Sequence, residues 1–241
     1  MELVLDAGNT RIKVARMEGQ QVKDLKIFLR QTETAQLRTY CREYAKLPAI
    51  LADVSPGDTE TEKAFAELNK LHRFSYLSPL PFAINYKTPQ TLGVDRLAAC
   101  AGAASLFPQK DVLVIDAGTC VTYDLLNKNT GYEGGAISPG LHMRYKALQQ
   151  FTGKLPLIEH RDFEDLTGKS TEESILSGVQ NGLIAEVSDI IAQYKATFPD
   201  LHLLICGGDA PFLAKRLKYD IFAEPNLVLT GLHYILKIHA G

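Results

Sequence analysis

Two short segments of the chain carry residue types that could bind phosphate. The chain begins MELVLDAGNT, and DVLVIDAGTC follows at 111–120. In each segment an apolar run ends at an aspartate, Asp6 or Asp116, and Ala-Gly and a hydroxyl or amide side chain follow at once. Glycine lets the backbone approach a ligand closely, and the N–H groups of a tight turn can surround phosphate oxygens. A carboxylate at the end of an apolar strand needs solvent, a partner or a cation, and a metal ion that accompanies phosphate would meet that need.

A single Asp-Ala-Gly turn is also ordinary turn chemistry, because Asp, Gly and Asn populate turns in all proteins. Here the turn recurs at the ends of corresponding strands in two halves of similar organisation. Two such turns favour a nucleotide held between two related domains.

The predicted elements follow the same order in both halves, with three strands and then a helix. In the first half the pattern predicts strands at 2–6, 11–16, 22–29, 48–54 and 73–77 and helices at 31–47 and 61–71. In the second half, strands at 111–116, 121–126 and 132–138 precede a helix at 141–151. The spacing of the two aspartates fits an internally duplicated domain. We therefore expect two domains, at 1–108 and 109–241.

The composition of the 241-residue chain is that of an ordinary globular protein, with 46% hydrophobic residues and a net charge of -2. This charge gives no field that would attract nucleic acid or a membrane. The four cysteines have no C-x-x-C spacing and the N-terminus has no leader pattern, so we expect a cytoplasmic protein. The apolar stretch 97–107 is too short to span a membrane. Its Ala, Gly and Ser residues predict tight packing on another helix, either in the core or at a domain or dimer contact.

Six motifs of the chain stand in the order found in a known enzyme family. They are DAGNTRIK (6–13), TLGVDRLAA (91–99), VIDAGTCVTYD (114–124), YEGGAISPG (132–140), TEESILSG (171–178) and CGGDA (206–210). In these motifs the chain resembles the type III pantothenate kinases, of the superfamily that includes acetate and sugar kinases, heat-shock 70 ATPases and actin. The resemblance implies an α/β architecture of two duplicated ribonuclease-H-like domains, the actin-like ATPase fold, with an interdomain nucleotide cleft. It also implies a homodimer that phosphorylates the primary hydroxyl of pantothenate with ATP, giving 4′-phosphopantothenate, the first step towards coenzyme A.

The resemblance assigns the first motif to the phosphates of ATP. The matching residues are Asp6, Ala7, Gly8, Asn9, Thr10, Arg11, Ile12 and Lys13. Asp6 would orient Mg²⁺ through water, and a lysine adds a point charge beside a phosphoryl group in transfer. Lys13 could also be an ordinary strand lysine on the solvent face.

In the second motif, the family's pattern assigns Thr119 to ATP and Asp116 to a monovalent cation, K⁺ or NH₄⁺. Gly207 and Gly208 of the last motif are also candidates for the ATP side. The chain departs from the family at Cys120, where the family usually has alanine. A cysteine is slightly larger and still apolar, so we expect ATP binding to survive the difference.

The GVDR run carries the predicted catalytic residue. The family's proposed general base matches Asp95, which could accept the proton of the attacking hydroxyl. Gly93, Val94 and Arg96 belong to the same substrate-binding run, and Arg96 suits a substrate with a carboxylate. The alternative is local: Asp is a common choice near a helix N-terminus, and Arg is commonly a solvated charge.

Two further positions match residues that contact pantothenate in the family. Tyr86 lies in the proline-rich loop before GVDR, where its ring could instead pack on the surface. Thr171 matches a threonine that contacts the pantothenate of the neighbouring subunit. It begins a predicted helix and is also expected to be its N-cap.

Three other functions remain open at this point. Another small-molecule kinase of the superfamily would share both phosphate turns but lack the GVDR and TEESILSG matches. A polymerising, actin-like protein would need insertions for which 241 residues leave little room. A relative called the Bvg accessory factor is a regulator, but the intact Asp95 argues for catalysis, and no helix-turn-helix pattern or basic face indicates DNA binding.

Overall fold

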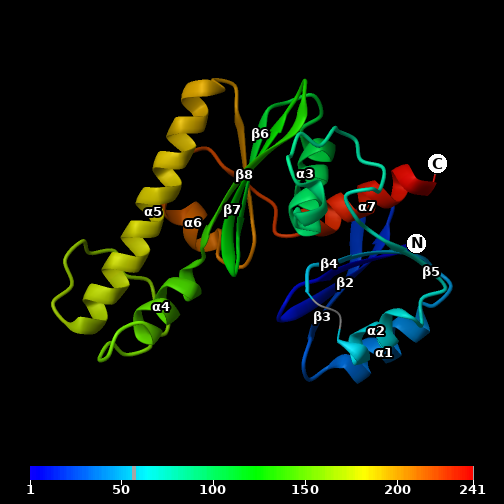
Figure 1. Ribbon diagram of the computed structural model, residues 1–241, viewed down its shortest axis with the longest axis horizontal. Helices are drawn as coiled ribbons and strands as arrows, with labels where there is room; N and C mark the ends of the chain where they lie inside the picture. Colours follow the sequence, from blue (N-terminus) through cyan, green and yellow to red (C-terminus); the bar gives the residue numbers. More distant parts are fainter. Residues whose placement is uncertain (56–57, 241) are drawn as a thin grey trace. The chain divides into compact units, whose positions relative to one another are not determined.

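In the computed structural model, which describes residues 1–55 and 58–240, a five-stranded sheet organises the N-terminal half of the chain (Figure 1). Its strands are β1 (Glu2–Ala7), β2 (Arg11–Glu18), β3 (Gln21–Leu29), β4 (Pro48–Asp53) and β5 (Lys70–Arg73), in the order β3-β2-β1-β4-β5. The pairs β1–β2 and β2–β3 are antiparallel, whereas β1–β4 and β4–β5 are parallel. Leu3, Val4 and Leu5 are fully buried, because the central strand β1 is covered on both faces.

A second five-stranded sheet repeats this order. Its strands are β6 (Val112–Ala117), β7 (Cys120–Asn127), β8 (Gly131–Pro139), β9 (His202–Cys206) and β10 (Phe222–Ala223), in the order β10-β9-β6-β7-β8. The strand β6 takes the place of β1, with β9 parallel to it and β10 parallel to β9. The predicted common order of the two halves is therefore confirmed, and each Asp-Ala-Gly turn follows the central strand of a sheet.

The helices of the structure, apart from a short 3-10 turn at Pro89–Thr91, number seven over the described residues. They are α1 (Thr34–Glu43), α2 (Thr59–Phe65), α3 (Val94–Leu106), α4 (Leu141–Gln150), α5 (Thr171–Thr197), α6 (Ala210–Arg216) and α7 (Leu227–Ala240). No helix in residues 1–55 and 58–240 is long and apolar enough to cross a membrane.

The predicted helix 61–71 and strand 73–77 are wrong in their bounds. The carboxylate of Asp58 accepts the backbone N–H of Thr61 at 2.7 Å, so α2 begins at Thr59 and ends at Phe65. The following strand β5 starts at Lys70, where it pairs in parallel with β4. Because of its pairing with β4, this strand begins and ends earlier in the chain than the local pattern predicted.

The small residues of α3 pack against α7. A Cβ atom on Gly231 would overlap the carbonyl oxygen of Ala98, and one on Gly102 would overlap the carbonyl of Leu227. These glycines allow the two helix backbones to approach closely, and the apolar stretch 97–107 serves the core.

The chain forms two compact units. The first contains residues 1–109 as far as they are described, 126–133 and the residues from 226 on, and the second contains 110–125 and 134–225. The helix α7 thus belongs to the first unit, although the sequence division at 108 and 109 assigns its residues to the second half. The division into two ribonuclease-H-like domains at that boundary stays a prediction.

Candidate active site

The first Asp-Ala-Gly turn joins β1 to β2 and places a lysine opposite its aspartate. Asp6 pairs directly with Lys13 in the antiparallel register, and the N–H of Gly8 donates to the carbonyl of Arg11 at 3.0 Å to close the turn. Side chains of directly opposed residues lie on the same face of a sheet. Lys13 is partly buried and faces the same side as Asp6, rather than being a strand lysine turned to solvent.

Asp6 is a carboxyl group that resists ionisation. Burial raises its pKa to about 6, the positive charge of Lys13 lowers it, and the negative charge of Asp95 raises it. Lys13 and Asp95 therefore both lie near enough to Asp6 to influence its ionisation, although Asp95 is far along the chain. A partly buried carboxylate with a second carboxylate nearby favours a bound cation.

Asp95 lies in the first turn of α3. Gly93 is the N-cap residue, so Asp95 is not itself the cap, and its Oδ1 accepts the backbone N–H of Arg96 at 2.8 Å. A Cβ atom on Gly93 would be only 2.6 Å from this oxygen. The carboxylate is folded back over the space that a side chain at position 93 would need, and Arg96 beside it is buried.

Tyr86 is held in place by the hairpin between β7 and β8. Ala83 accepts the N–H of Tyr132, Tyr132 accepts the N–H of Asn85, and the rings of Tyr86 and Tyr132 lie 6.0 Å apart, tilted by 54°. A Cβ atom on Gly131 would overlap the carbonyl of Ala83, so only glycine lets the loop and the hairpin approach this closely. One part of the Tyr86 ring therefore packs on Tyr132, and the side chain stays partly exposed.

The second Asp-Ala-Gly turn is fixed by two neighbouring loops of its own unit. The N–H of Gly140 donates to the carbonyl of Thr119 at 3.1 Å, and the N–H of Asp209 donates to that of Ala117 at 2.8 Å. Within the turn, Gly118 donates to Cys120 at 2.9 Å. The three motifs that contain these residues are distant in the sequence, and the structure brings them together around an exposed Thr119.

Gly207 closes this second turn from the side of the CGGDA motif. Its φ is +93°, which favours glycine, and a Cβ atom there would overlap both the carbonyl oxygen of Ala117 and the carboxylate of Asp116. These two oxygens therefore border the same small space. No atom of the described residues would come within 4 Å of a Cβ on Gly208, so its backbone is open to a ligand.

Thr171 is the first residue of α5, but the prediction that it is the N-cap is wrong. Ser170 is the N-cap, and its hydroxyl accepts the N–H of Glu173 at 3.2 Å. Ser170 and Thr171 are adjacent hydroxyl residues, and the sequence does not distinguish them because either type can cap a helix. Since Ser170 performs that role, the exposed Thr171 hydroxyl is available to a ligand.

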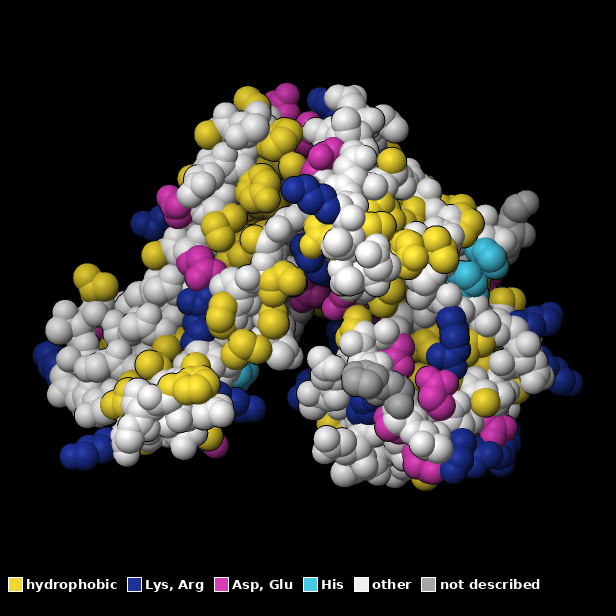
Figure 2. Space-filling model, viewed as in Figure 1, with side chains coloured by type: hydrophobic (Ala, Val, Ile, Leu, Met, Phe, Trp, Pro, Cys, Tyr) yellow, Lys and Arg dark blue, Asp and Glu magenta, His cyan; other side chains and the backbone are white. Residues whose placement is uncertain are grey.

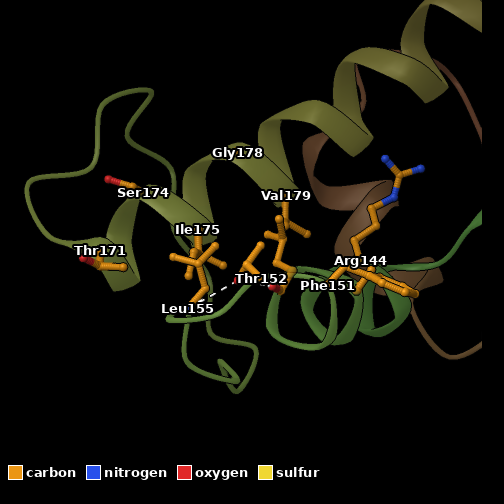
Figure 3. Close-up of a pocket in the computed structure, with 11 residues that line it drawn as sticks. Arg144, Phe151, Thr152, Leu155, Thr171, Ser174, Ile175, Gly178 and Val179 are labelled. Carbon is orange, nitrogen blue, oxygen red and sulfur yellow. Dashed lines mark hydrogen bonds between the residues drawn. The ribbon is translucent and has the colours of Figure 1, made fainter.

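Thr171 lines an open apolar groove of about 860 Å³ between α4 and α5. In Figure 3, Thr171 lies at one end and Arg144 at the other, and Ile175 and Val179 point towards the α4 side of the groove. Figure 2 shows hydrophobic side chains gathered over α4, and Phe151 at the groove is 81% exposed. An exposed apolar surface of this kind is typical of an interaction site.

The structure adds two arginines, Arg30 and Arg144, that no sequence motif marked as part of a site. Arg30 contacts the first turn through the carbonyl of Gly8. Arg144 donates to the carbonyl of Pro139 at 2.8 Å and to Glu186 at 2.7 Å. Each joins residues from separate elements, and no local motif marks such a contact.

The described residues contain no cluster of three or more His, Cys, Asp or Glu side chains arranged for a metal ion. A metal at the first turn would therefore take ligands from one or two carboxylates, water and the phosphates of a bound nucleotide, as Mg²⁺ prefers. Asp6 fits that requirement through its burial and its proximity to Asp95.

Comparisons with known proteins agree with the motifs. Residues 2–193 match the family model described as type III pantothenate kinase. The chain is 41% identical to a type III pantothenate kinase of Christiangramia forsetii over 240 residues, covering 99% of each chain. It is also 41% identical to that of Bacteroides fragilis over 245 residues, covering 100% of this chain and 99% of the relative.

Solved structures show a likeness at the level of the fold. A Campylobacter jejuni protein assigned to the Baf family of transcriptional activators matches with a TM-score of 0.66 at 20% identity, over 99% of this chain and 98% of its own. A Sinorhizobium meliloti protein assigned as a 2-dehydro-3-deoxygalactonokinase matches with a TM-score of 0.62 at 14% identity, over 100% of this chain and 98% of its own. At these identities the likeness concerns architecture alone, and it supports the duplicated ribonuclease-H-like α/β fold already seen in the two sheets.

The family model covers most of the chain, and relatives of about the same length align with it from end to end. The chain therefore belongs to the type III pantothenate kinase family.

Proposed function

We infer that this protein transfers the γ-phosphoryl group of ATP to the primary hydroxyl of pantothenate, forming 4′-phosphopantothenate and ADP. The observation that carries the proposal is the group formed by Asp6, Lys13 and Asp95 in the first unit. It supplies a carboxylate for a metal, a cation for a phosphoryl group and a second carboxylate for a proton. Kinases of this kind need mainly positioning and charge compensation, which such a group can provide.

Asp95 is proposed as the general base. In the reaction the hydroxyl oxygen of pantothenate forms a bond to the γ-phosphorus as the bond to the β–γ bridging oxygen breaks, and the hydroxyl proton passes to the Asp95 carboxylate. The hydrogen bond from Arg96 N–H fixes one carboxylate oxygen at 2.8 Å. The guanidinium of Arg96 would pair with the carboxylate of pantothenate, and Gly93, Val94 and Tyr86 would border the substrate.

The first turn, residues 6–13, is proposed to hold the ATP phosphates. Asp6 would bind Mg²⁺ through water and Lys13 would face the transferred group. When bound, Mg²⁺ offsets the charge of the phosphate oxygens. Exposed Asn9 and Thr10 can offer N–H and hydroxyl donors to the same oxygens.

The second turn is proposed to contribute Thr119 to ATP and Asp116 to a K⁺ or NH₄⁺ ion. The Asp116 carboxylate and the Ala117 carbonyl border one small space beside Gly207, and carbonyl oxygens are ligands that K⁺ takes in proteins. The open backbone at Gly208 would contact the nucleotide, and Gly207 beside it would belong to the same ATP-binding segment. We propose that both turns contribute to the binding of ATP, as the family resemblance implies.

A homodimer is proposed because the groove at α4 and α5 combines an apolar lining with Thr171 at its edge. A second copy seated there would place this threonine beside the partner's pantothenate. The cysteines show no disulfide-like spacing, and we place the protein in the reducing cytoplasm.

The proposed reaction is tested with purified protein, ATP, Mg²⁺, K⁺ and pantothenate, with the product identified by mass spectrometry. We expect 4′-phosphopantothenate, and no product with acetate or simple sugars in place of pantothenate. Absence of phosphorylated product with every acceptor would refute the enzymatic function. Exchange of K⁺ for Na⁺ tests the cation separately, and equal rates in both salts would refute a specific K⁺ site.

A further inference from the structure

Arg30 is a buried cation directly behind the first phosphate turn. It follows β3, its backbone N–H donates to the carbonyl of Thr10 at 3.0 Å, and its side chain is only 6% exposed. A guanidinium is rarely buried unless its charge is paired and its N–H groups are hydrogen-bonded. The partners of Arg30 therefore indicate what this residue does.

Two carboxylates hold the guanidinium in a fixed orientation. Nη1 and Nη2 donate to the two oxygens of Asp53 at 3.1 and 3.2 Å, and Nε donates to Asp58 at 3.2 Å. Asp53 ends β4 and lies in register with Ala7 of β1, so the bidentate pair is tied to the edge of the sheet from which the turn emerges. A bidentate arginine pair fixes direction as well as distance.

The same Nη1 atom donates to the carbonyl oxygen of Gly8 at 3.1 Å. The peptide between Gly8 and Asn9 is trans, like every peptide bond of the described residues. In a trans peptide the N–H points opposite to the C=O. By holding the Gly8 carbonyl towards itself, Arg30 directs the N–H of Asn9 to the opposite side of the turn.

The direction of this peptide matters for an anion. Glycine tolerates both orientations of the peptide that follows it, because without a Cβ atom it adopts positive and negative φ almost equally well. An N–H facing a phosphate attracts its oxygens, whereas a carbonyl in that place repels them. We propose that Arg30 is a positioning residue for ATP, which holds the Gly8–Asn9 peptide with its N–H directed to the nucleotide phosphates. The inference rests on the proposed function only in that residues 6–13 bind ATP.

The test replaces Arg30 by lysine, which keeps the buried charge but offers one nitrogen in place of the three that donate to Asp53, Asp58 and Gly8. The matched control is Arg73→Lys, because Arg73 also forms a two-nitrogen pair with a carboxylate, Glu62, in the same unit, but is 52% exposed. For both variants we measure the KM of ATP, the KM of pantothenate, kcat, the unfolding temperature and the Kd of Mg·ADP by calorimetry.

We expect Arg30→Lys to raise the KM of ATP and the Kd of Mg·ADP by roughly tenfold, the effect of losing one hydrogen bond to a charged group. The KM of pantothenate should stay within about twofold, and Arg73→Lys should match the wild type in all constants. A lower unfolding temperature with an unchanged KM of ATP and an unchanged Kd of Mg·ADP would overturn the proposal, since it would show a structural role only.

A second variant covers the case in which Arg30→Lys does not fold. Asp58→Asn retains an oxygen that can accept the N–H of Thr61 at the start of α2, but it removes the charge paired with Nε of Arg30. A rise in the Kd of Mg·ADP supports the proposal, and no change overturns it. The Kd does not depend on turnover, so failure of the proposed function, seen as no product from the wild type, is distinguished from failure of the role of Arg30.

Discussion

The carboxylate of Asp95 occupies the space that a side chain on Gly93 would need. A Cβ atom at Gly93 would be 2.6 Å from Asp95 Oδ1, closer than non-bonded atoms approach. The glycine of GVDR therefore has a role in placing the proposed base, in addition to starting α3.

Gly93→Ala should displace the Asp95 carboxylate and lower kcat by roughly tenfold or more, because proton transfer depends on hydrogen-bond geometry. The unfolding temperature should change little, since the atom displaced is the end of a short side chain. The control is Gly182→Ala in α5, where a Cβ would meet no atom within 4 Å in the described structure and where alanine favours the helix. An unchanged kcat for Gly93→Ala would contradict the proposed placement.

Asp95→Asn should fold normally, because the amide oxygen can still accept the N–H of Arg96. Loss of the base should reduce kcat by about 10²–10⁴-fold, with the KM of ATP nearly unchanged. Steady-state kinetics and a thermal melt measure both effects, with the exposed Asp200→Asn as the control. A variant that keeps wild-type kcat would remove Asp95 from the chemistry.

Asp6→Asn should stabilise the metal-free protein while abolishing its activity. Burial raises the folded-state pKa of Asp6 from 3.8 to about 6, so ionised Asp6 opposes folding. This loss of unfolding free energy is absent below the pKa of the unfolded state and grows as the pH rises from about 4 to about 6. Above that pH it is constant, at no more than about 3 kcal/mol. Denaturant unfolding in EDTA from about pH 4 to about pH 8 should show that the free energy of unfolding of the variant rises relative to that of the wild type between about pH 4 and about pH 6. Parallel curves for the two proteins would contradict a raised pKa.

Glu186→Gln should destabilise the second unit. Glu186 accepts hydrogen bonds from Tyr123, Ser138 and Arg144, and its side chain is 29% exposed. Burial alone would raise the pKa of Glu186, but the bonds from Ser138 and Arg144 lower it below its ordinary value. Its charge therefore stabilises the fold above pH about 4.5, and this contribution is lost as the pH falls through the lowered pKa.

The expected loss for Glu186→Gln at neutral pH is about 1–3 kcal/mol, because Arg144 loses its charged partner. Glu172→Gln on the same helix is the control, since its pair with Arg161 is about half exposed on both sides. Melting temperatures of both variants at neutral and acidic pH provide the measurement. Equal melting temperatures for the two variants at neutral pH would contradict a structural role for the Glu186 network.

Phe151→Glu should convert the proposed dimer to a monomer, because it puts a charge into the apolar groove. The matched control is Leu166→Glu, since Leu166 is 82% exposed, compared with 81% for Phe151, and does not line the groove. Light scattering after size exclusion gives the mass of each variant. A dimer that persists in Phe151→Glu would place the interface elsewhere.

The sequence alone determined the two turns and the succession along the chain of three strands and a helix in each half. An apolar run that ends in Asp-Ala-Gly is a local pattern, and the chain repeats it where β1 and β6 end. The sequence left open whether Lys13 faces solvent, and the register of β1 and β2 decided that it lies opposite Asp6. The family motifs then pointed to Asp95, since a motif keeps its residues together in the sequence.

Only the tertiary structure decided which distant side chains support these local features. Arg30 reaches Gly8 and Asp53 across 22 and 23 positions, and Glu186 reaches Ser138 and Tyr123 across 48 and 63. Such contacts depend on how whole elements pack, and the chain carries no periodicity or spacing that marks them. The same holds for α7, whose apolar sequence suits any core but which packs on α3, because Gly102 and Gly231 allow their backbones to meet.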